Sequence, residues 1–282
     1  MKKGLILEGG AMRGIFTCGV LDVLMEEGIE FDGGAGISAG ALYGINYKSK
    51  QIGRGVRYTK KYCRDKRFCS FKSLIKTGDL YGVDFCYREI PDELDIFDRK
   101  TFTENPFEFY AGATNLETGE VIFHKCTDGG KNDVTWLQAS ASMPAVSRLV
   151  HVDGYTLLDG GIVCPIPYEF VEGLGYDKNV AVLTQPADYV KKKTRGMFIY
   201  NRALKEYPNI AKIMGERHNL YNDMTAAIKE KEAAGKLFVI RPPEALGIKR
   251  TENNPDELER VYQMGRSEAL KKLPELKEYL AN

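Results

Sequence analysis

The sequence has almost no net charge, because 40 Lys and Arg residues face 39 Asp and Glu residues and leave a formal charge of +1. A chain without a strong global field is not drawn over long range to nucleic acid or to membranes. Any such attraction has to come from a local patch, so nucleic acid is not an expected partner.

Long apolar runs are also missing. After Lys2 and Lys3, the apolar stretch 4–7 is interrupted by Glu8, whereas a signal-peptide core or a membrane span needs a much longer run. The expected location is cytoplasmic, with or without peripheral contact at the inner membrane surface.

Cysteine and histidine are scarce and scattered. The six cysteines include no C-x-x-C pair, and no histidine lies at metal-ligand spacing from them. This pattern indicates neither a zinc site nor a disulfide framework. We therefore expect no metal and no cofactor.

The amino-terminal part alternates strand and helix signals. A buried strand at 5–7 is followed by an amphipathic helix between Gly14 and Gly28, a second strand at 31–37 and a helix from Ala39. Successive β-α units predict parallel strands with helices over both faces of the sheet. The predicted fold class is therefore α/β.

The rest of the chain adds hairpins and then helices. Asp153-Gly154 is a strong signal for a two-residue hairpin turn. The predicted organisation is a catalytic core at 1–185 and a mostly helical extension at 186–282, packed on the core and contributing a strand near 237–240. Further expected elements are strands at 107–111, 121–123, 150–152, 155–158 and 180–183, a helix from Asn132 or Asp133 to Ala141, and a helix at 256–279.

Gly36-Ile37-Ser38-Ala39-Gly40 is a G-x-S-x-G pentapeptide between a predicted strand and a predicted helix. The flanking Gly36 and Gly40 permit a sharp turn from which the serine hydroxyl projects. The helix that follows directs its N-terminal amides toward the serine. Ser38 is the candidate nucleophile of an acyl hydrolase.

A glycine-rich loop follows the first strand. In Glu8-Gly9-Gly10-Ala11-Met12-Arg13-Gly14, small residues leave consecutive backbone N–H groups free to point at an anion. We expect Gly9, Gly10 and Ala11 to donate to an oxyanion while Arg13 supplies nearby positive charge.

A hydroxyl nucleophile needs a base. His124, His151 and His218 come without a supporting motif. Asp159 differs from the histidines, because it ends a hairpin strand and is followed directly by Gly160-Gly161. Backbone groups that approach closely at these glycines can hold its carboxylate in place.

Together, the loop 9–14, the turn 36–40 and Asp159-Gly160-Gly161 resemble the G-G-x-x-R/K-G, G-x-S-x-G and D-G-G/A motifs of the patatin-like phospholipase family, bacterial type. The Ala- and Ser-rich segment before Pro144 is similar too, and the resemblance covers about the first 185 residues. It implies a three-layer α/β/α fold, a Ser38–Asp159 dyad without histidine, and hydrolysis of fatty-acyl esters of lipids or lysolipids. One departure is Ala11 where many members have glycine, which would be strained if the position requires positive φ.

Two other classes of function stay open. Gly34-x-Gly36-x-x-Ala39 also fits a dinucleotide fingerprint, which would make the protein an NADP-dependent oxidoreductase. The basic and aromatic segment 54–76 could instead belong to a non-catalytic protein that binds an anionic membrane or RNA. In a lipid hydrolase, the same segment would provide peripheral contact with the membrane surface.

Overall fold

One eight-stranded sheet organises the chain in the computed structural model, which describes residues 1–282. The strand order is β5-β6-β3-β2-β1-β7-β8, and β4 pairs with β3. Neighbours from β3 to β8 are parallel, and the pairings of β4, β5 and β6 are antiparallel. The strands are β1 (Lys3–Leu7), β2 (Gly33–Ile37), β3 (Glu108–Asn115), β4 (Val121–Cys126), β5 (Val150–Val152), β6 (Tyr155–Asp159), β7 (Lys178–Val182) and β8 (Phe238–Ile240).

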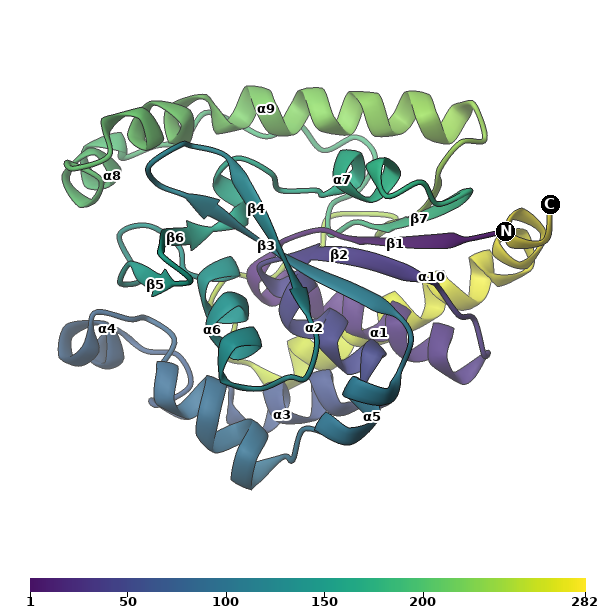
Figure 1. Cartoon of the computed structure of the whole chain (residues 1–282), viewed down its shortest axis with the longest axis horizontal. Helices are drawn as coiled ribbons and strands as arrows, with labels where there is room; N and C mark the ends of the chain where they lie inside the picture. Colours follow the sequence, from purple (N-terminus) through teal and green to yellow (C-terminus); the bar gives the residue numbers. More distant parts are fainter.

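Helices cover both faces of this sheet, with α7 and α9 on one side and α1, α2, α3 and α10 on the other (Figure 1). The predicted three-layer α/β fold is therefore confirmed. The α-helices are α1 (Gly14–Glu26), α2 (Ala39–Lys48), α3 (Arg54–Tyr62), α4 (Phe71–Thr77), α5 (Arg99–Glu104), α6 (Lys131–Ser140), α7 (Tyr168–Gly173), α8 (Met197–Ala203), α9 (Pro208–Ala233) and α10 (Pro255–Ala281). Two 3₁₀ turns, η1 (Ala11–Arg13) and η3 (Gly160–Ile162), and a π-helical segment, η2 (Phe85–Leu94), complete the set.

The alternation of side chains along β1 builds the two interior layers. Leu5 and Leu7 point to one face and join the large apolar core shared with α1 and α10. Ile6 points to the other face and packs in a second core with residues of α7 and α9. All three side chains are fully buried, as expected for a central parallel strand.

Local sequence signals explain several boundaries. Gly28 follows α1 with a φ of 64°, and Asp153 and Gly154 both have positive φ in the tight β5–β6 turn. The start of α6 differs from the prediction, since Gly130 and not Asn132 or Asp133 is the N-cap residue. The Asp133 carboxylate instead accepts backbone N–H groups of the preceding loop.

Two strands meet end to end along one edge of β3. Ile37 at the end of β2 pairs with Gly112, and Asp159 at the end of β6 pairs with the next residue, Ala113. Because β2 and β6 run in opposite directions along β3, their carboxyl ends face each other. This arrangement brings Ser38, which follows β2, next to Asp159.

The carboxyl-terminal region packs against the rest of the chain on both faces of the sheet. The strand β8 extends the sheet beside β7, where the sequence predicts a strand. Helix α10 packs along α1, and the two backbones come closest where Gly19 faces Tyr262 and Gly265 faces Phe16. None of the helices combines the length and the apolar character that crossing a bilayer requires.

We predict that Gly265→Ala destabilises the fold by about 3 kcal/mol, because the added methyl group would overlap the carbonyl oxygen of Phe16 in α1. Gly173→Ala is the matched control: its methyl group would meet no atom within 4 Å, so its stability should stay within about 1 kcal/mol of wild type. Urea unfolding measures both variants. Equal unfolding midpoints would contradict the proposed close packing of α1 on α10.

Candidate functional site

The turn that carries Ser38 is sharp and strained. Ser38 has φ 52° and ψ −120° between β2 and α2, a backbone conformation that side-chain-bearing residues rarely adopt. The turn requires glycine at position 36, because a Cβ atom there would lie only 2.6 Å from the carbonyl oxygen of Gly40. Gly40 in turn packs against the backbone of Leu7 and Glu8 at the end of β1.

The end of α6 and the residues just after it hold both Ser38 and Asp159 in place. The Ser38 N–H donates to Oγ of Ser140 at 2.9 Å, and this hydroxyl donates to the carbonyl oxygen of Gly112 at 2.6 Å. The Asp159 N–H donates to the carbonyl oxygen of Ser142 at 2.8 Å. The Ala- and Ser-rich segment therefore supports the site directly.

The Asp159 carboxyl group is almost completely buried, with 2% of the residue exposed. Its Oδ1 accepts the Gly161 N–H at 2.7 Å, while Oδ2 is buried without a hydrogen-bond partner. Burial raises the pKa of Asp159, and the Ser38 hydroxyl, the Arg217 charge and the Gly161 N–H partly offset this rise. The hydroxyl thus lies beside the carboxyl, although the pair lacks ideal hydrogen-bond geometry, as is common without substrate.

The glycine-rich loop lines the same small cavity of about 60 Å³ as Ser38 and Asp159. One predicted donor is engaged elsewhere, since the Gly9 N–H donates to the carbonyl oxygen of Pro165 at 3.2 Å. The N–H groups of Gly10 and Ala11 have no acceptor within the protein. Ala11 has φ 49°, so the strain expected for alanine at this position is present.

Arg13 also lines this cavity, and its Nε is buried without a hydrogen-bond partner. Gly161 lines the cavity too. Gly160 packs against the backbone of Gly112 in β3, where a Cβ atom would overlap the Gly112 carbonyl oxygen. The glycines after Asp159 therefore let this turn lie directly on the sheet.

The sequence did not connect several residues of the cavity with the site, and all of them lie far from Ser38 along the chain. Lys191, Arg217 and Arg250 line it, and Arg217 Nε donates to the carbonyl oxygen of Gly161. Tyr221 of α9 donates to Oε1 of the buried Glu8 at 2.7 Å. None of these residues belongs to a motif, so only the folded chain brings them to Ser38.

A larger apolar cavity of about 460 Å³ shares Ala11, Ser38, Met143 and Arg250 with the small cavity. Hydrophobic residues make up 23 of its 33 lining residues. Such a lining suits an acyl chain, whose transfer from water is favourable by about 0.8 kcal/mol for each buried CH₂ group.

No histidine lines the cavity that contains Ser38. His124 bonds to Asp133, His151 approaches Thr156 at 3.3 Å, and His218 bonds to the carbonyl oxygen of Gly215. Two carboxylates line it, and Glu8 is engaged by the Thr184 N–H and the Tyr221 hydroxyl. The Asp159 carboxylate, which lies beside the Ser38 hydroxyl, is therefore the candidate acceptor of the serine proton.

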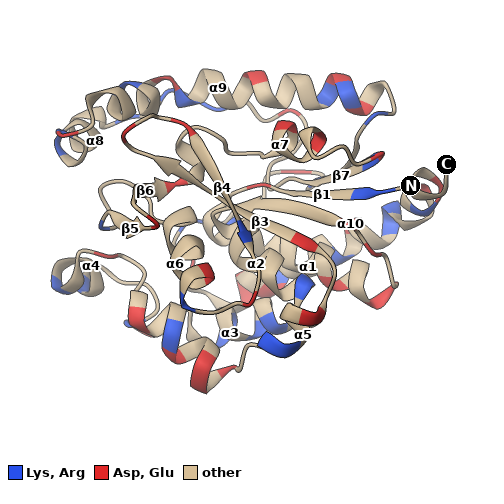
Figure 2. Ribbon diagram, in the orientation of Figure 1, with Lys and Arg blue, Asp and Glu red and all other residues tan.

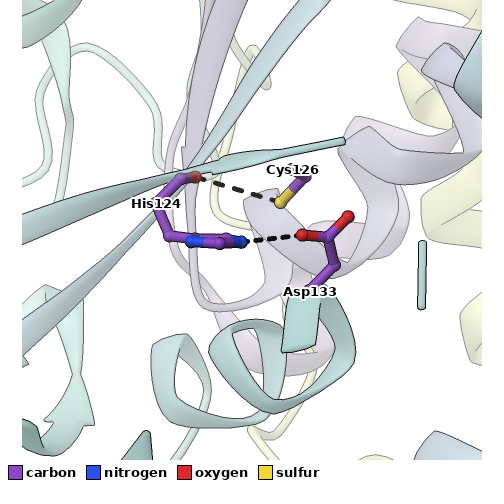
Figure 3. Close-up of side chains that lie close together, drawn as sticks. All are labelled: His124, Cys126 and Asp133. Atoms are coloured by element: carbon purple, nitrogen blue, oxygen red, sulfur yellow. Dashed lines mark hydrogen bonds and ion pairs between the residues drawn. The ribbon is translucent and has the colours of Figure 1, made fainter. Parts of the chain in front are cut away.

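His124, Cys126 and Asp133 form a separate cluster, with their potential ligand atoms within 4.8 Å of one another (Figure 3). Asp133 already accepts from His124 at 2.7 Å and from the backbone N–H groups of 127–129. Burial raises the pKa of the Cys126 thiol, which disfavours the thiolate that binds metals. The cluster is best described as a hydrogen-bonded support for the loop 127–129.

The dinucleotide interpretation has no basis in the fold. Gly34 and Gly36 lie within β2, paired to β1 and β3, and not in the loop after the strand. A pyrophosphate-binding fingerprint needs its glycines in that loop, and Ser38 alone separates β2 from α2. Gly34 instead allows close packing against Leu5 of β1, and Gly36 allows the turn into α2.

Comparisons with known proteins identify the family of this chain. The model of the patatin-like phospholipase family matches residues 5–171, and a domain of unknown function (DUF6363) matches residues 207–281. The uncharacterized protein YjjU of Escherichia coli is 26% identical over 93% of this chain and 74% of its own. Lysophospholipase nte1 of Aspergillus niger is 29% identical over 64% of this chain, which spans only 12% of that protein.

An uncharacterized NTE family protein of Mycobacterium bovis is 27% identical over 64% of this chain and 48% of its own. Among solved structures, VipD from Legionella pneumophila matches 97% of this chain and 67% of its own, with a TM-score of 0.47 and 12% identity. The family model covers more than half of the chain. The protein therefore belongs to the patatin-like phospholipase family, a family of lipid hydrolases.

Proposed function

We propose that this protein is a serine acyl hydrolase that cleaves fatty-acyl esters of phospholipids or lysophospholipids through Ser38 and Asp159. One observation carries the proposal: Ser38 and a buried carboxyl group line one small cavity, and Ser38 also lines a large apolar cavity. A reacting ester at Ser38 would thus have its acyl chain in an apolar environment. The fungal relatives named as lysophospholipases support the same class of substrate.

In the first step, Oγ of Ser38 attacks the ester carbonyl carbon while Asp159 accepts the hydroxyl proton. The negative charge that develops on the carbonyl oxygen is stabilised by the free N–H groups of Gly10 and Ala11 and by the positive charge of Arg13. Asp159 then returns the proton to the leaving alcohol, and the acyl group stays on Ser38. Because Gly9 donates to Pro165, its role in this proposal is to position the loop.

In the second step, water attacks the acyl-enzyme. Asp159 accepts a proton from this water and returns it to Ser38 as the fatty acid leaves. The carboxylate must therefore be ionised at the start of each step, although burial favours its protonated form.

We predict that Ser38→Ala and Asp159→Asn each lower kcat/KM for p-nitrophenyl esters by at least about 10³-fold, because each removes one half of the nucleophile–base pair. Ser267→Ala and Asp188→Asn, at exposed positions, are the matched controls and should keep full activity. A fluorophosphonate probe should label wild type and both controls but not Ser38→Ala. Unchanged turnover in Ser38→Ala would refute the proposal.

The raised pKa of Asp159 also predicts an effect on stability. A carboxyl group whose pKa is higher in the folded state stabilises the fold at pH values below its unfolded pKa, and this contribution is lost as the pH rises through the folded pKa. Asp159→Asn should therefore be more stable than wild type at pH 8, and the difference should shrink as the pH falls and Asp159 becomes protonated. Urea unfolding at several pH values measures this difference. A variant less stable than wild type at pH 8 would contradict the electrostatic assignment.

The first part of the predicted membrane-contact segment 54–76 is engaged within the protein. Arg54 is buried, and both it and Arg57 pair with Asp95. Lys60 pairs with Glu259 of α10. These three cations therefore hold α3 against the rest of the protein and are not free to bind a lipid surface.

Helix α4 remains exposed, and α8 lies at the same end of the molecule (Figure 1). Phe71 and Ile75 of α4 are 77% and 87% exposed, and Phe198 of α8 is 75% exposed. Lys72 and Lys76 also belong to α4, whose ribbon carries the blue of basic residues in Figure 2, and Ile199 of α8 lines the apolar cavity. We name Phe71, Ile75 and Phe198 the interfacial rim and propose that it contacts anionic membranes.

We predict that Phe71→Ser/Ile75→Ser lowers binding to vesicles containing anionic lipid by at least about tenfold, because inserted apolar side chains contribute about 1.5–3 kcal/mol each. Leu270→Ser, at an exposed position on α10, is the matched control and should bind as wild type does. Vesicle flotation measures the bound fraction. Equal binding by the Phe71→Ser/Ile75→Ser protein and the Leu270→Ser control would show that the interfacial rim does not contact the membrane.

A further inference from the structure

A third cavity, of about 380 Å³, lies beside the candidate site and is strongly basic. Five cationic side chains are among its 11 lining residues, and no Asp or Glu is. We name it the basic cavity; its cations are Lys191, Lys192, Arg195, Arg217 and Arg250. All of them lie outside the segment 5–171 that the patatin-like family model matches.

The basic cavity adjoins the place where the ester would react. Met143 and Arg250 line the basic cavity, the apolar cavity and the small cavity that contains Ser38. Lys191 and Arg217 line both the basic and the small cavity. A ligand at Ser38 can thus extend in two directions, one apolar and one cationic.

These cations have no carboxylate in direct contact. None of the five forms an ion pair with a carboxylate, although 18 ion pairs occur elsewhere in the chain. Arg217 uses Nε to bind Gly161, and its other guanidinium N–H groups have no acceptor. Burial and the neighbouring charges of Arg217, Arg250 and Arg13 lower the pKa of Lys191 to about 7. A bound anion would relieve this repulsion.

We infer that the basic cavity binds the anionic phosphate headgroup of the lipid substrate while the acyl chain occupies the apolar cavity. Guanidinium and ammonium groups form short, charge-assisted hydrogen bonds to phosphate oxygens. A quaternary ammonium headgroup would instead face five cations without a carboxylate to offset them. The inference rests on the proposed function and specifies its substrate class: lipids whose headgroup carries net negative charge at the phosphate.

The test compares lysophosphatidate with lysophosphatidylcholine of the same acyl chain, both in mixed micelles with a neutral detergent. In wild type, kcat/KM should be at least about tenfold higher for lysophosphatidate, a difference of about 1.4 kcal/mol. Lys191→Met and Arg195→Gln should each reduce this ratio by about tenfold. Lys193→Met removes an exposed cation that does not line the cavity, so it should keep the wild-type ratio.

The ratio is taken within one protein, so a general loss of activity cancels. Equal efficiency for both lipids in wild type, or an unchanged ratio in both cavity variants, would overturn the inference while leaving the proposed hydrolase intact. Conversely, absence of all Ser38-dependent hydrolysis would refute the proposed function.

Binding to the Ser38→Ala protein gives a readout without catalysis. Calorimetry should show tighter binding of lysophosphatidate than of lysophosphatidylcholine, and only weak binding of inorganic phosphate, which has no acyl chain to bury. Inorganic phosphate bound as tightly as lysophosphatidate would assign the cavity to free phosphate and overturn the headgroup assignment.

Discussion

The candidate site depends on the edge of β3, where β2 and β6 end against each other. Parallel pairing of β2 and antiparallel pairing of β6 bring Ile37 and Asp159 to adjacent positions, Gly112 and Ala113. Backbone hydrogen bonds of the sheet therefore set the separation of Ser38 and Asp159. Side chains then only have to orient the two groups, as Ser140 does when it accepts the Ser38 N–H.

Several features of the site oppose stability. Ser38 and Ala11 have positive φ, Asp159 is buried with one oxygen unbonded, and Arg13 has a buried Nε without a partner. Strained backbone and unpaired buried polar groups persist only where the surrounding structure holds them firmly. Here the two apolar cores on either side of β1 provide that support.

The carboxyl-terminal region does more than cover the sheet. Through Arg217 it reaches the turn after Asp159, and through Tyr221 it reaches Glu8 at the end of β1. The same region, with the segment around Lys191, supplies the cations of the basic cavity. In the proposed function, the segment that the family model matches holds the nucleophile and the base. The residues that follow it bind the headgroup and so select the substrate. The division of the chain near residue 185 stays a prediction.

The sequence by itself determined the features that depend on local backbone geometry: the turn around Ser38, the loop at Gly10, the strand–turn junction at Asp159, and through them the fold class and family. Glycine spacing reveals these because close backbone approach excludes a Cβ atom wherever it occurs. Only the tertiary structure decided which N–H groups are free, since Gly9 is engaged by Pro165, and which charges are paired, since Arg54 is buried against Asp95. Those outcomes depend on contacts between residues far apart in the chain, which no local pattern encodes.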